Sequence, residues 1–401
     1  LEQHGPQQWP LPTGATEGTA RLYADGRFPT ETGRARFVPV AWQPVAEARS
    51  AQYPLALNTG RLRDQWHGMS RTGTVGRLYG HAPEPVVQMH PQDMARRHLR
   101  EGELVAIHSR RGSIFAPLQG SSDLGLGQAY MAMHWGEEAL GGHNAAHQAL
   151  AGVNTLLPSA FCPQSKQPEL KNAAVRIEKA GLPWSLLAMA WLPAADWLAA
   201  RTGLQALMAR FPFTSCVPFS PASALDGAPE GGTPAQVGLL FRAAAHEPPP
   251  EALLARIEAL LDLEGPRSLR YADARQGQRR TLRLESRNGD TLVRGLLLAG
   301  DTRAQVWLRT LVQDELPAQD YGRLLLAPGA TPPVALAARG RTVCSCVGVS
   351  DSAIQAALAA HPGSDDERLA HLQASLRCGT QCGSCVPELR RMVRQAAPSA
   401  P

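Results

Sequence analysis

The segment Leu376–Arg391 reads LRCGTQCGSCVPELRR and contains three thiols, Cys378, Cys382 and Cys385. Cys382 and Cys385 form a Cys-x-x-Cys pair directly before a stretch that we expect to be helical, VPELRRMVRQA. The N-terminus of a helix favours thiolates and an anionic centre, because its dipole is positive there and its N–H groups are free. Cys378 ends the preceding expected helix, and we predict that it is a neighbour of the centre and not a ligand.

A second pair of thiols lies upstream in RTVCSCVGVSDSAI, where Cys344 and Cys346 form a Cys-x-Cys motif before another expected helix. About 35 residues separate the two pairs, which is enough for two short helices. Both pairs can therefore meet around one inorganic centre. We expect Gly348, Gly379 and Gly383 to let the backbone approach this centre and donate N–H groups to its sulfur atoms.

The spacing of the cysteines leaves two kinds of centre open. Structural zinc usually takes Cys-x-x-Cys pairs, for which a Cys-x-Cys spacing is awkward, whereas a 2Fe-2S cluster accepts four thiolates. Spacing alone favours the cluster over zinc. Five of the seven cysteines lie in the last 58 residues. This clustering is typical of metal binding in a reducing compartment, not of a disulfide framework.

The pattern VCSCVGVSDSAI followed by CGTQCGSCVPELRRMV resembles the 2Fe-2S domain of bacterioferritin-associated ferredoxins. The resemblance covers about the last 60 residues and implies a small all-α, helix-turn-helix electron carrier. It also implies that the cluster ligands are Cys344, Cys346, Cys382 and Cys385. We expect three helices here: SDSAIQAALAA, with Ser350 as its N-cap, DDERLAHLQASL, and VPELRRMVRQA.

Composition excludes several other classes of protein. The net charge is +5 over 401 residues, without a run of five or more Lys or Arg, so we expect no nucleic-acid partner. The apolar stretch PWSLLAMAWLPAADWLAA is too short and too interrupted to span a bilayer, and it predicts a buried or interfacial helix pair. The chain begins LEQHGPQQWP, without a signal peptide, and this start is typical of the middle of a longer protein. We therefore expect a cytoplasmic fragment.

Short strands with turn signals fill the region before this stretch. YPLALNTG, QAYMAMHW, and the two arms ELVAIHS and SIFAPLQ, which turn at Arg111-Gly112, predict a barrel or sandwich. The loop after the first strand, in LNTGRLRDQWHGMSRTGTVGRL, is rich in arginine and hydroxyl groups. Such donors beside a glycine turn suit a phosphate-bearing ligand, although a solvated arginine-rich loop explains them equally well.

Several stretches of this region together resemble the dinucleotide-binding domain of the molybdopterin oxidoreductase family, and within it assimilatory nitrate reductases. The stretches are LNTGRLRDQWHGMSRTG, HPQDM, GELVAIHSRRGS, MHWG, VNTL and SKQPELK. The resemblance implies a six-stranded β-barrel that holds a molybdenum bis(molybdopterin guanine dinucleotide), with the loop 59–68 around the pterin. Carried over residue by residue, the cofactor-binding positions are Asn58, Thr59, Gly60, Arg61, Trp66, His67, Ser70, Arg71, Thr72, His134, Trp135, Asn154 and Lys171.

One position departs from the family pattern, because Cys162-Pro163 stands where Asp-Pro is common. The change removes a carboxylate, and we expect a buried free cysteine there.

The sequence predicts a multidomain chain. Residues 1–50, with a possible hairpin at Asp25-Gly26, form a connector at the edge of a larger catalytic body, and residues 51–180 form the barrel. Residues 181–235 form a helical segment and a linker, and residues 236–340 a small α+β scaffold domain with a hairpin at Asn288-Gly289. This scaffold resembles small domains beside 2Fe-2S modules in nitrite reductase and related flavin reductases. Residues 341–401 form the 2Fe-2S domain.

The resemblance implies the C-terminal part of a molybdenum enzyme that reduces nitrate to nitrite. The N-terminal region with a 4Fe-4S cluster and the catalytic body is missing, so we expect no catalytic residue here and no activity from the chain alone. The electron donor would be ferredoxin, flavodoxin or an NAD(P)H-linked flavoprotein. The alternatives are a formate dehydrogenase or another molybdopterin oxidoreductase, a stand-alone electron-transfer module, and a zinc-stabilised interaction protein.

Overall fold

The structure is a computed structural model that describes residues 7–39, 41–220, 235–327, 329, 331–332, 336 and 340–396. The chain divides into two compact units, Leu1–Val45 and Ala46–Pro401. In the first unit a turn forms at the expected place, because Gly26 N–H donates to Tyr23 O over 3.0 Å. No strand flanks this turn in residues 7–39 and 41–45, so the possible hairpin is wrong for the described part of that unit.

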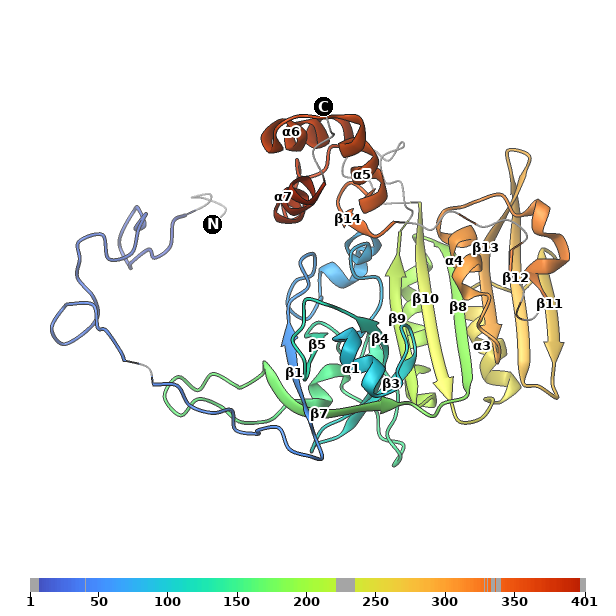
Figure 1. The fold of residues 1–401 in the computed structure, drawn as a ribbon, viewed down its shortest axis with the longest axis horizontal. Coiled ribbons are helices and arrows are strands. Elements are labelled where there is room, and N and C mark those ends of the chain that lie inside the picture. Colours follow the sequence, from blue (N-terminus) through green and yellow to red (C-terminus); the bar gives the residue numbers. More distant parts are fainter. Residues whose placement is uncertain are drawn as a thin grey trace. The chain divides into compact units, whose positions relative to one another are not determined.

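Six strands of the second unit close into a barrel, as the sequence predicts (Figure 1). The alternation of buried and exposed residues along the first strand, LALNTG, places leucines inside. β1 and β5 pair in parallel, as do β2 and β4, and the other neighbours are antiparallel. In barrel order the strands are β1 (Leu55–Gly60), β5 (Gln128–Ala132), β2 (Val87–Met89), β4 (Ser113–Gly120), β3 (Leu104–His108) and β7 (Asn172–Lys179).

Short helices complete the barrel region. His90 caps the first α-helix, since its Nδ1 accepts from Gln92 N–H over 3.1 Å. The predicted hairpin between β3 and β4 is confirmed. The helices are α1 (Pro91–Arg96) and the 3₁₀ segments η1 (Thr72–Thr74), η2 (Gly76–Tyr79) and η3 (Gly152–Leu156).

A seven-stranded sheet follows the barrel, and in Figure 1 its long strands lie side by side. The predicted turn at Asn288-Gly289 is confirmed, because both residues have positive φ, 55° and 89°, between two paired strands. In sheet order the strands are β11 (Ser268–Asp273), β12 (Gln278–Arg287), β13 (Asp290–Ala299), β8 (Trp184–Pro193), β10 (Gln236–Ala245), β9 (Phe213–Phe219) and β6 (Leu140–Gly141).

The expected helix pair in the stretch 183–200 is wrong for its first half, because residues Trp184–Pro193 form β8. One face of β8 belongs to the core with α2 and α3, and the opposite face belongs to the core with α4. A strand buried on both faces loses its polar alternation, and its sequence then reads like a buried helix. The second half does form a helix, α2 (Trp197–Gln205).

β8 and β9 pair into the same sheet as the strands of residues 236–299. Residues 181–235, which the sequence predicts as a separate segment, therefore contribute two strands to that body. The predicted linker falls largely on residues 221–234, which lie outside the described residues. Two α-helices of this body follow β10 and β13 in the chain, and Ala304 occupies the N-cap position of the second. The remaining helices of this body are α3 (Glu251–Leu260), α4 (Gln305–Gln313), η4 (Met208–Arg210) and η5 (Gln319–Leu325).

The C-terminal residues form a small helical domain with a core of its own. Ser350 caps its first helix as predicted, since its Oγ accepts from Ala353 N–H over 3.3 Å. Ser364 and Glu367 form a capping box at the start of the second helix. The elements are β14 (Thr342–Cys344), β15 (Val349–Ser350), α5 (Asp351–Ala360), α6 (Asp365–Leu376) and α7 (Val386–Gln395). Among the described residues, no helix is long and apolar enough to cross a membrane.

Candidate functional site

Four cysteines from the two motifs meet in the C-terminal domain. The Sγ atoms of Cys344 and Cys346 are 3.6 Å apart, and those of Cys346 and Cys382 are 3.7 Å apart. Cys344 also donates a hydrogen bond to Cys385. The sulfur atoms thus form a chain in the order 385, 344, 346 and 382.

The separations within this chain fit metal coordination in pairs. Two thiolates on one tetrahedral ion, with metal–sulfur bonds of about 2.3 Å, are about 3.8 Å apart. A 2Fe-2S cluster distributes four thiolates over two irons and so needs such pairs. In the part of the chain that the structure describes, no three His, Cys, Asp or Glu groups are arranged to hold a single metal ion. The separations of 3.6 and 3.7 Å between neighbouring sulfur atoms fit paired ligands of a cluster.

Backbone N–H groups surround the sulfur atoms. The N–H of Gly379 faces the Cys344 sulfur, as predicted, and that of Ser384 faces the Cys382 sulfur. The expectation for Gly348 is wrong, because its N–H donates to the carbonyl oxygen of Cys344 over 2.7 Å. Amide donors of this kind stabilise negative charge on cluster sulfur atoms.

The four thiols differ in acidity. Hydrogen bonding to Cys385 and burial raise the pKa of Cys344 far above its usual range, and burial raises the pKa of Cys346 to about 12. Hydrogen bonds from Ser384 lower the pKa of Cys382, and the hydrogen bond from Cys344 lowers the pKa of Cys385. Cys344 and Cys346 therefore hold their protons more strongly than Cys382 and Cys385, and metal binding has to displace them.

Cys378 lies apart from this chain of contacts. Its side chain is buried, and its Sγ donates to the carbonyl oxygen of Leu372 in α6 over 3.4 Å. Burial also raises the pKa of Cys378 to about 11. This geometry supports the prediction that Cys378 is not a ligand.

One rim of the barrel gathers most of the predicted cofactor positions. β1 runs parallel to β5 with Gly60 opposite Ala132, and antiparallel to β7 with Asn58 opposite Asn172. The C-terminal ends of β1 and β5 and the start of β7 therefore meet at the same rim. The predicted residues on these ends are Asn58, Thr59, Gly60, Arg61, His134, Trp135 and Lys171.

Hydrogen bonds hold two further loops at this rim. The Nδ1 atom of His134 bonds to the carbonyl oxygen of His67. Val153 N–H donates to Trp135 O over 3.0 Å, which brings the 3₁₀ segment with Asn154 to the end of β5. The structure thus brings together positions that lie nearly 100 residues apart in the sequence.

Exposure divides the predicted residues into two groups. Trp135 is 1% exposed and packs against Tyr79, with ring centroids 6.3 Å apart, so its ring does not face a ligand on the rim. Thr59 is buried and donates through Oγ1 to Leu170 O over 2.5 Å. The buried side chains of this set can hold loops in position, but they expose little surface to a ligand. Exposed side chains belong to Asn58, Arg61, Trp66, His67, Ser70, Arg71, Asn154 and Lys171, while Gly60 and Thr72 are partly exposed.

The expectation that Cys162 is a buried free cysteine is wrong. It is partly exposed, on a loop where Ser165 N–H donates to its Sγ over 3.5 Å. Hydrogen bonds from Ser165 and the neighbouring backbone lower the pKa of this thiol.

The loop after β1 also contacts the cysteine motifs directly. Asp64 Oδ2 accepts from Ser345 Oγ over 2.6 Å, and Asp64 Oδ1 accepts from Ser384 Oγ over 3.0 Å. Arg63 Nη2 donates to Val343 O over 2.6 Å. The sequence analysis missed Asp64 and both serines. A signal was present, since a serine directly precedes the last cysteine of each motif.

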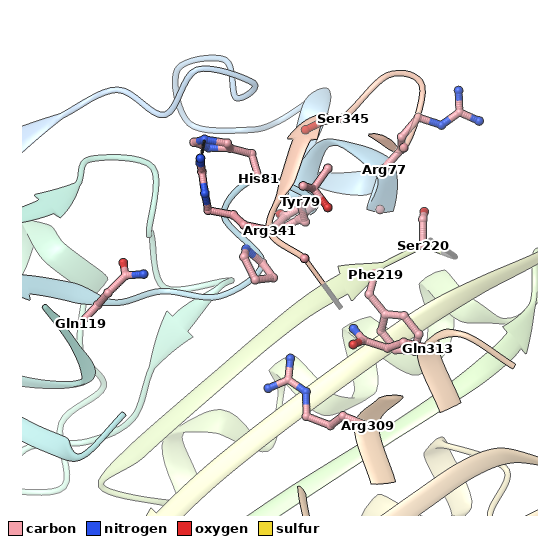
Figure 2. A pocket seen from close by; sticks show the side chains of 16 residues that line it. Arg77, Tyr79, His81, Gln119, Phe219, Ser220, Arg309, Gln313, Arg341 and Ser345 are labelled. Atoms are coloured by element: carbon pink, nitrogen blue, oxygen red, sulfur yellow. Dashed lines mark hydrogen bonds between the residues drawn. The ribbon is translucent and has the colours of Figure 1, made fainter. Parts of the chain in front are cut away.

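A cavity of about 480 Å³ opens beside these contacts, between the barrel, the large sheet and the C-terminal domain (Figure 2). Its lining includes Arg77, His81, Arg309 and Arg341. Two of the three arginines are paired with carboxylates: Arg309 donates to Glu84 over 2.6 Å, and Arg341 donates to Glu388 of α7 and lies 3.3 Å from His81.

Two family models match the chain. The model described as "Molydopterin dinucleotide binding domain" matches residues 55–174, and the model described as "BFD-like [2Fe-2S] binding domain" matches residues 342–395. These ranges contain the barrel rim and the four cysteines, respectively. The chain therefore carries a molybdopterin dinucleotide-binding domain and a BFD-like 2Fe-2S domain.

Curated relatives extend the similarity. The chain is 33% identical to a nitrate reductase of Klebsiella oxytoca over 366 residues, which cover 90% of this chain and 36% of that protein. It is 39% identical to a nitrate reductase of Synechocystis over 44% of this chain and 24% of that protein. It is 32% identical to an F420-dependent formate dehydrogenase subunit alpha of Methanocaldococcus jannaschii over 43% of this chain and 23% of that protein. The chain thus spans about a third or less of the length of these relatives.

Proposed function

We propose that this chain, with its molybdopterin dinucleotide-binding and 2Fe-2S domains, is the cofactor-binding and electron-entry part of a molybdenum-dependent, assimilatory nitrate reductase. The observation that carries the proposal is the meeting of four cysteines directly beside the loop of the dinucleotide-binding domain. Asp64 of that loop accepts hydrogen bonds from both cysteine motifs. A redox centre in this position adjoins the domain that binds the catalytic cofactor.

In the electron-entry role, Cys344, Cys346, Cys382 and Cys385 hold a 2Fe-2S cluster. The backbone N–H groups of Gly379 and Ser384 stabilise the charge on its sulfur ligands. Ferredoxin, flavodoxin or an NAD(P)H-linked flavoprotein would be the electron donor, and a 4Fe-4S cluster in the remainder of the enzyme would be the acceptor.

In the cofactor role, the exposed residues of the rim bind the diphosphate and pterin of a molybdopterin guanine dinucleotide. Arg61 and Lys171 supply positive charge there, and Asn58 supplies an amide. His134 acts through His67, whose carbonyl oxygen it holds. When bound, the molybdenum cofactor supplies the two-electron reduction of nitrate to nitrite. We assign no catalytic residue to this chain and expect no turnover by the chain alone. We propose that the complete enzyme is cytoplasmic.

Nitrate is favoured over formate by the extent of the similarity. The match to the Klebsiella nitrate reductase covers 90% of this chain, whereas the formate dehydrogenase match covers 43%. In the full-length enzyme, reduced viologen should be oxidised on addition of nitrate. Formate-dependent dye reduction without nitrate activity would reject this choice of substrate.

The cluster is tested on the 401-residue chain, purified anaerobically and assayed for iron, acid-labile sulfide and zinc. We expect about two irons and two sulfides per chain and an EPR signal after dithionite reduction. Cys382→Ser should lose the signal, whereas the matched variant Cys378→Ser should keep it. Stoichiometric zinc without sulfide would overturn the electron-entry role.

The barrel is tested by acid release of nucleotide from the protein isolated with its cofactor. Recovered guanine nucleotide supports the proposal, and Arg61→Ala together with Lys171→Ala should lower the recovery. A chain that holds the cluster but binds no guanine nucleotide would be a stand-alone electron-transfer module.

A further inference from the structure

Asp64 brings a buried carboxylate from the barrel to both cysteine motifs. Its two oxygens accept hydrogen bonds from Ser345, over 2.6 Å, and from Ser384, over 3.0 Å. The Asp64 side chain is 7% exposed. The barrel therefore contributes an acceptor to the immediate surroundings of the four thiols, although it contributes no thiol.

Arg63 keeps this carboxylate ionised and fixes its position. Its Nε and Nη2 atoms donate to the two oxygens of Asp64 over 3.0 and 2.9 Å, and its Nη1 atom donates to Glu388 of α7 over 2.8 Å. Burial by itself raises the pKa of Asp64, but the hydrogen bonds from Arg63 and Ser345 outweigh it and hold the pKa below its usual range. A fixed negative charge therefore lies beside the cysteine motifs at neutral pH.

Ser384 has two possible acceptors for one proton. Its Oγ lies 3.2 Å from Cys382 Sγ and 3.0 Å from Asp64 Oδ1. A hydroxyl has a single proton, and an ionised carboxylate can only accept. Asp64 and Cys382 therefore compete for the proton of Ser384, and the nearer, ionised carboxylate of Asp64 draws it away from the sulfur.

Hydrogen bonds to ligand sulfur and the local net charge both set the potential of an iron–sulfur centre. A donor to sulfur or a nearby cation stabilises the reduced, more negative cluster. Asp64 acts in the opposite direction twice, because it withholds the Ser384 proton from Cys382 and adds a negative charge.

We propose that Asp64 is a positioning residue that keeps the reduction potential of the 2Fe-2S cluster low when the C-terminal domain is docked on the barrel. The inference rests on the proposed function, since it requires the cluster. It goes beyond that function by making the potential depend on the loop after β1, the same loop that we propose to hold the molybdenum cofactor. A shift of this loop then changes the driving force of electron entry.

The test is an EPR-monitored dithionite titration of the 401-residue chain, after iron and sulfide have been assayed. Asp64→Asn should shift the midpoint potential to a more positive value, because the charge is lost and a neutral amide is a weaker acceptor. Ser384→Ala should shift the potential less than Asp64→Asn, since in the wild type the hydroxyl proton is drawn mainly to Asp64. Combining the two should give a smaller rise than Asp64→Asn alone.

Asp366→Asn is the matched control, because Asp366 is an exposed residue of α6 in the same domain and loses the same charge. Equal shifts in D64N and D366N, or no shift in D64N with iron and sulfide intact, would overturn the inference but leave the proposed function standing. A wild-type chain without iron and sulfide would overturn both. If D64N loses its iron, Asp64→Glu keeps the charge and disturbs only the hydrogen bonds. A smaller positive shift than the one expected for D64N supports the inference, and an unchanged potential contradicts it.

Discussion

The barrel has two neighbours in this chain and is joined to them in different ways. Its buried side chains continue into one face of the seven-stranded sheet, so that Leu57 and Met131 of the barrel share a core with Met189 and Val217 of the sheet. The short strand β6, from the barrel segment, even pairs with β9. Barrel and sheet therefore form one apolar body.

The C-terminal domain meets the barrel through polar groups instead. Its buried residues form a separate core, which contains Leu372, Leu389 and the cysteines. The contacts described above between this domain and the barrel are hydrogen bonds and ion pairs, centred on Arg63, Asp64 and Glu388. An apolar interface is non-directional and stable, whereas a polar one fixes geometry at a small gain in free energy. The large sheet acts as a scaffold, and the polar interface positions the redox domain.

Even the apolar body contains buried ionic contacts, and the contact of Glu84 with two arginines gives the largest expected effect. Glu84 is 8% exposed and accepts from Arg242 over 3.0 Å and from Arg309 over 2.6 Å. Glu84→Gln leaves two arginines without their carboxylate, so we expect the free energy of unfolding of the barrel–sheet body to fall by about 3–5 kcal/mol. Urea unfolding measures this loss. The exposed Glu137 is the control, and an equal loss in Glu137→Gln would contradict the interpretation.

A substitution in the separate core should act on the C-terminal domain alone. Leu389 is fully buried in α7, and Leu389→Ala should cost about 2–5 kcal/mol through lost burial and a cavity. Hydrogen exchange should accelerate in residues 342–396 and remain unchanged in the barrel and the large sheet.

Leu198→Ala is the control for this prediction, because Leu198 is 53% exposed. Accelerated exchange throughout the barrel in the Leu389→Ala variant would mean that the two bodies unfold together, and the comparison between the interfaces would fail.

Acid should weaken the barrel–sheet body through the same carboxylate. Two arginines offset the burial of Glu84 and lower its pKa from 4.5 to about 2. Its contribution to stability is therefore complete above pH 4.5 and disappears as the pH falls toward 2. At pH 3 the expected loss is about 2 kcal/mol relative to pH 7. Urea unfolding at pH 7 and at pH 3 should show this loss in the wild type. In Glu84→Gln the other carboxylates still titrate, but the loss that Glu84 contributes should be absent.

The sequence predicts elements well where the signal is local. Asn288-Gly289 marks its hairpin because both positions need positive φ, and Ser350 marks a helix start because its side chain replaces a missing backbone partner. The cysteine spacings likewise identify the domain that brings the thiols together. β8 was misread because burial on both faces removes the alternation that identifies a strand.

Contacts between domains lie beyond such signals. Asp64 meets Ser345 and Ser384 across 281 and 320 positions of sequence, and no periodicity or spacing relates residues so far apart. The ring of Trp135 was assigned to the cofactor from a resemblance, but its burial against Tyr79 follows from how the barrel closes. The burial of a side chain against a residue 56 positions away is a tertiary contact that sequence patterns do not predict.

The polar interface should be the more sensitive of the two to salt, although the effect is small. Arg341 is 46% exposed and pairs within the C-terminal domain with Glu388, which in turn accepts from Arg63 of the barrel across the interface. Partly exposed ion pairs contribute about 0.2–1 kcal/mol and are screened by salt. Arg341→Ala should therefore accelerate hydrogen exchange in residues 61–66 and 342–346 by at most about fivefold in dilute buffer, and the difference should vanish in about 0.5 M salt.

The exposed Arg390 of α7 provides the control variant, Arg390→Ala, which should leave these segments unchanged. If salt accelerates hydrogen exchange in the barrel–sheet body as strongly as in the C-terminal domain, then charge and not apolar burial holds both interfaces. The large sheet and the C-terminal domain would then not differ in how they are joined to the barrel.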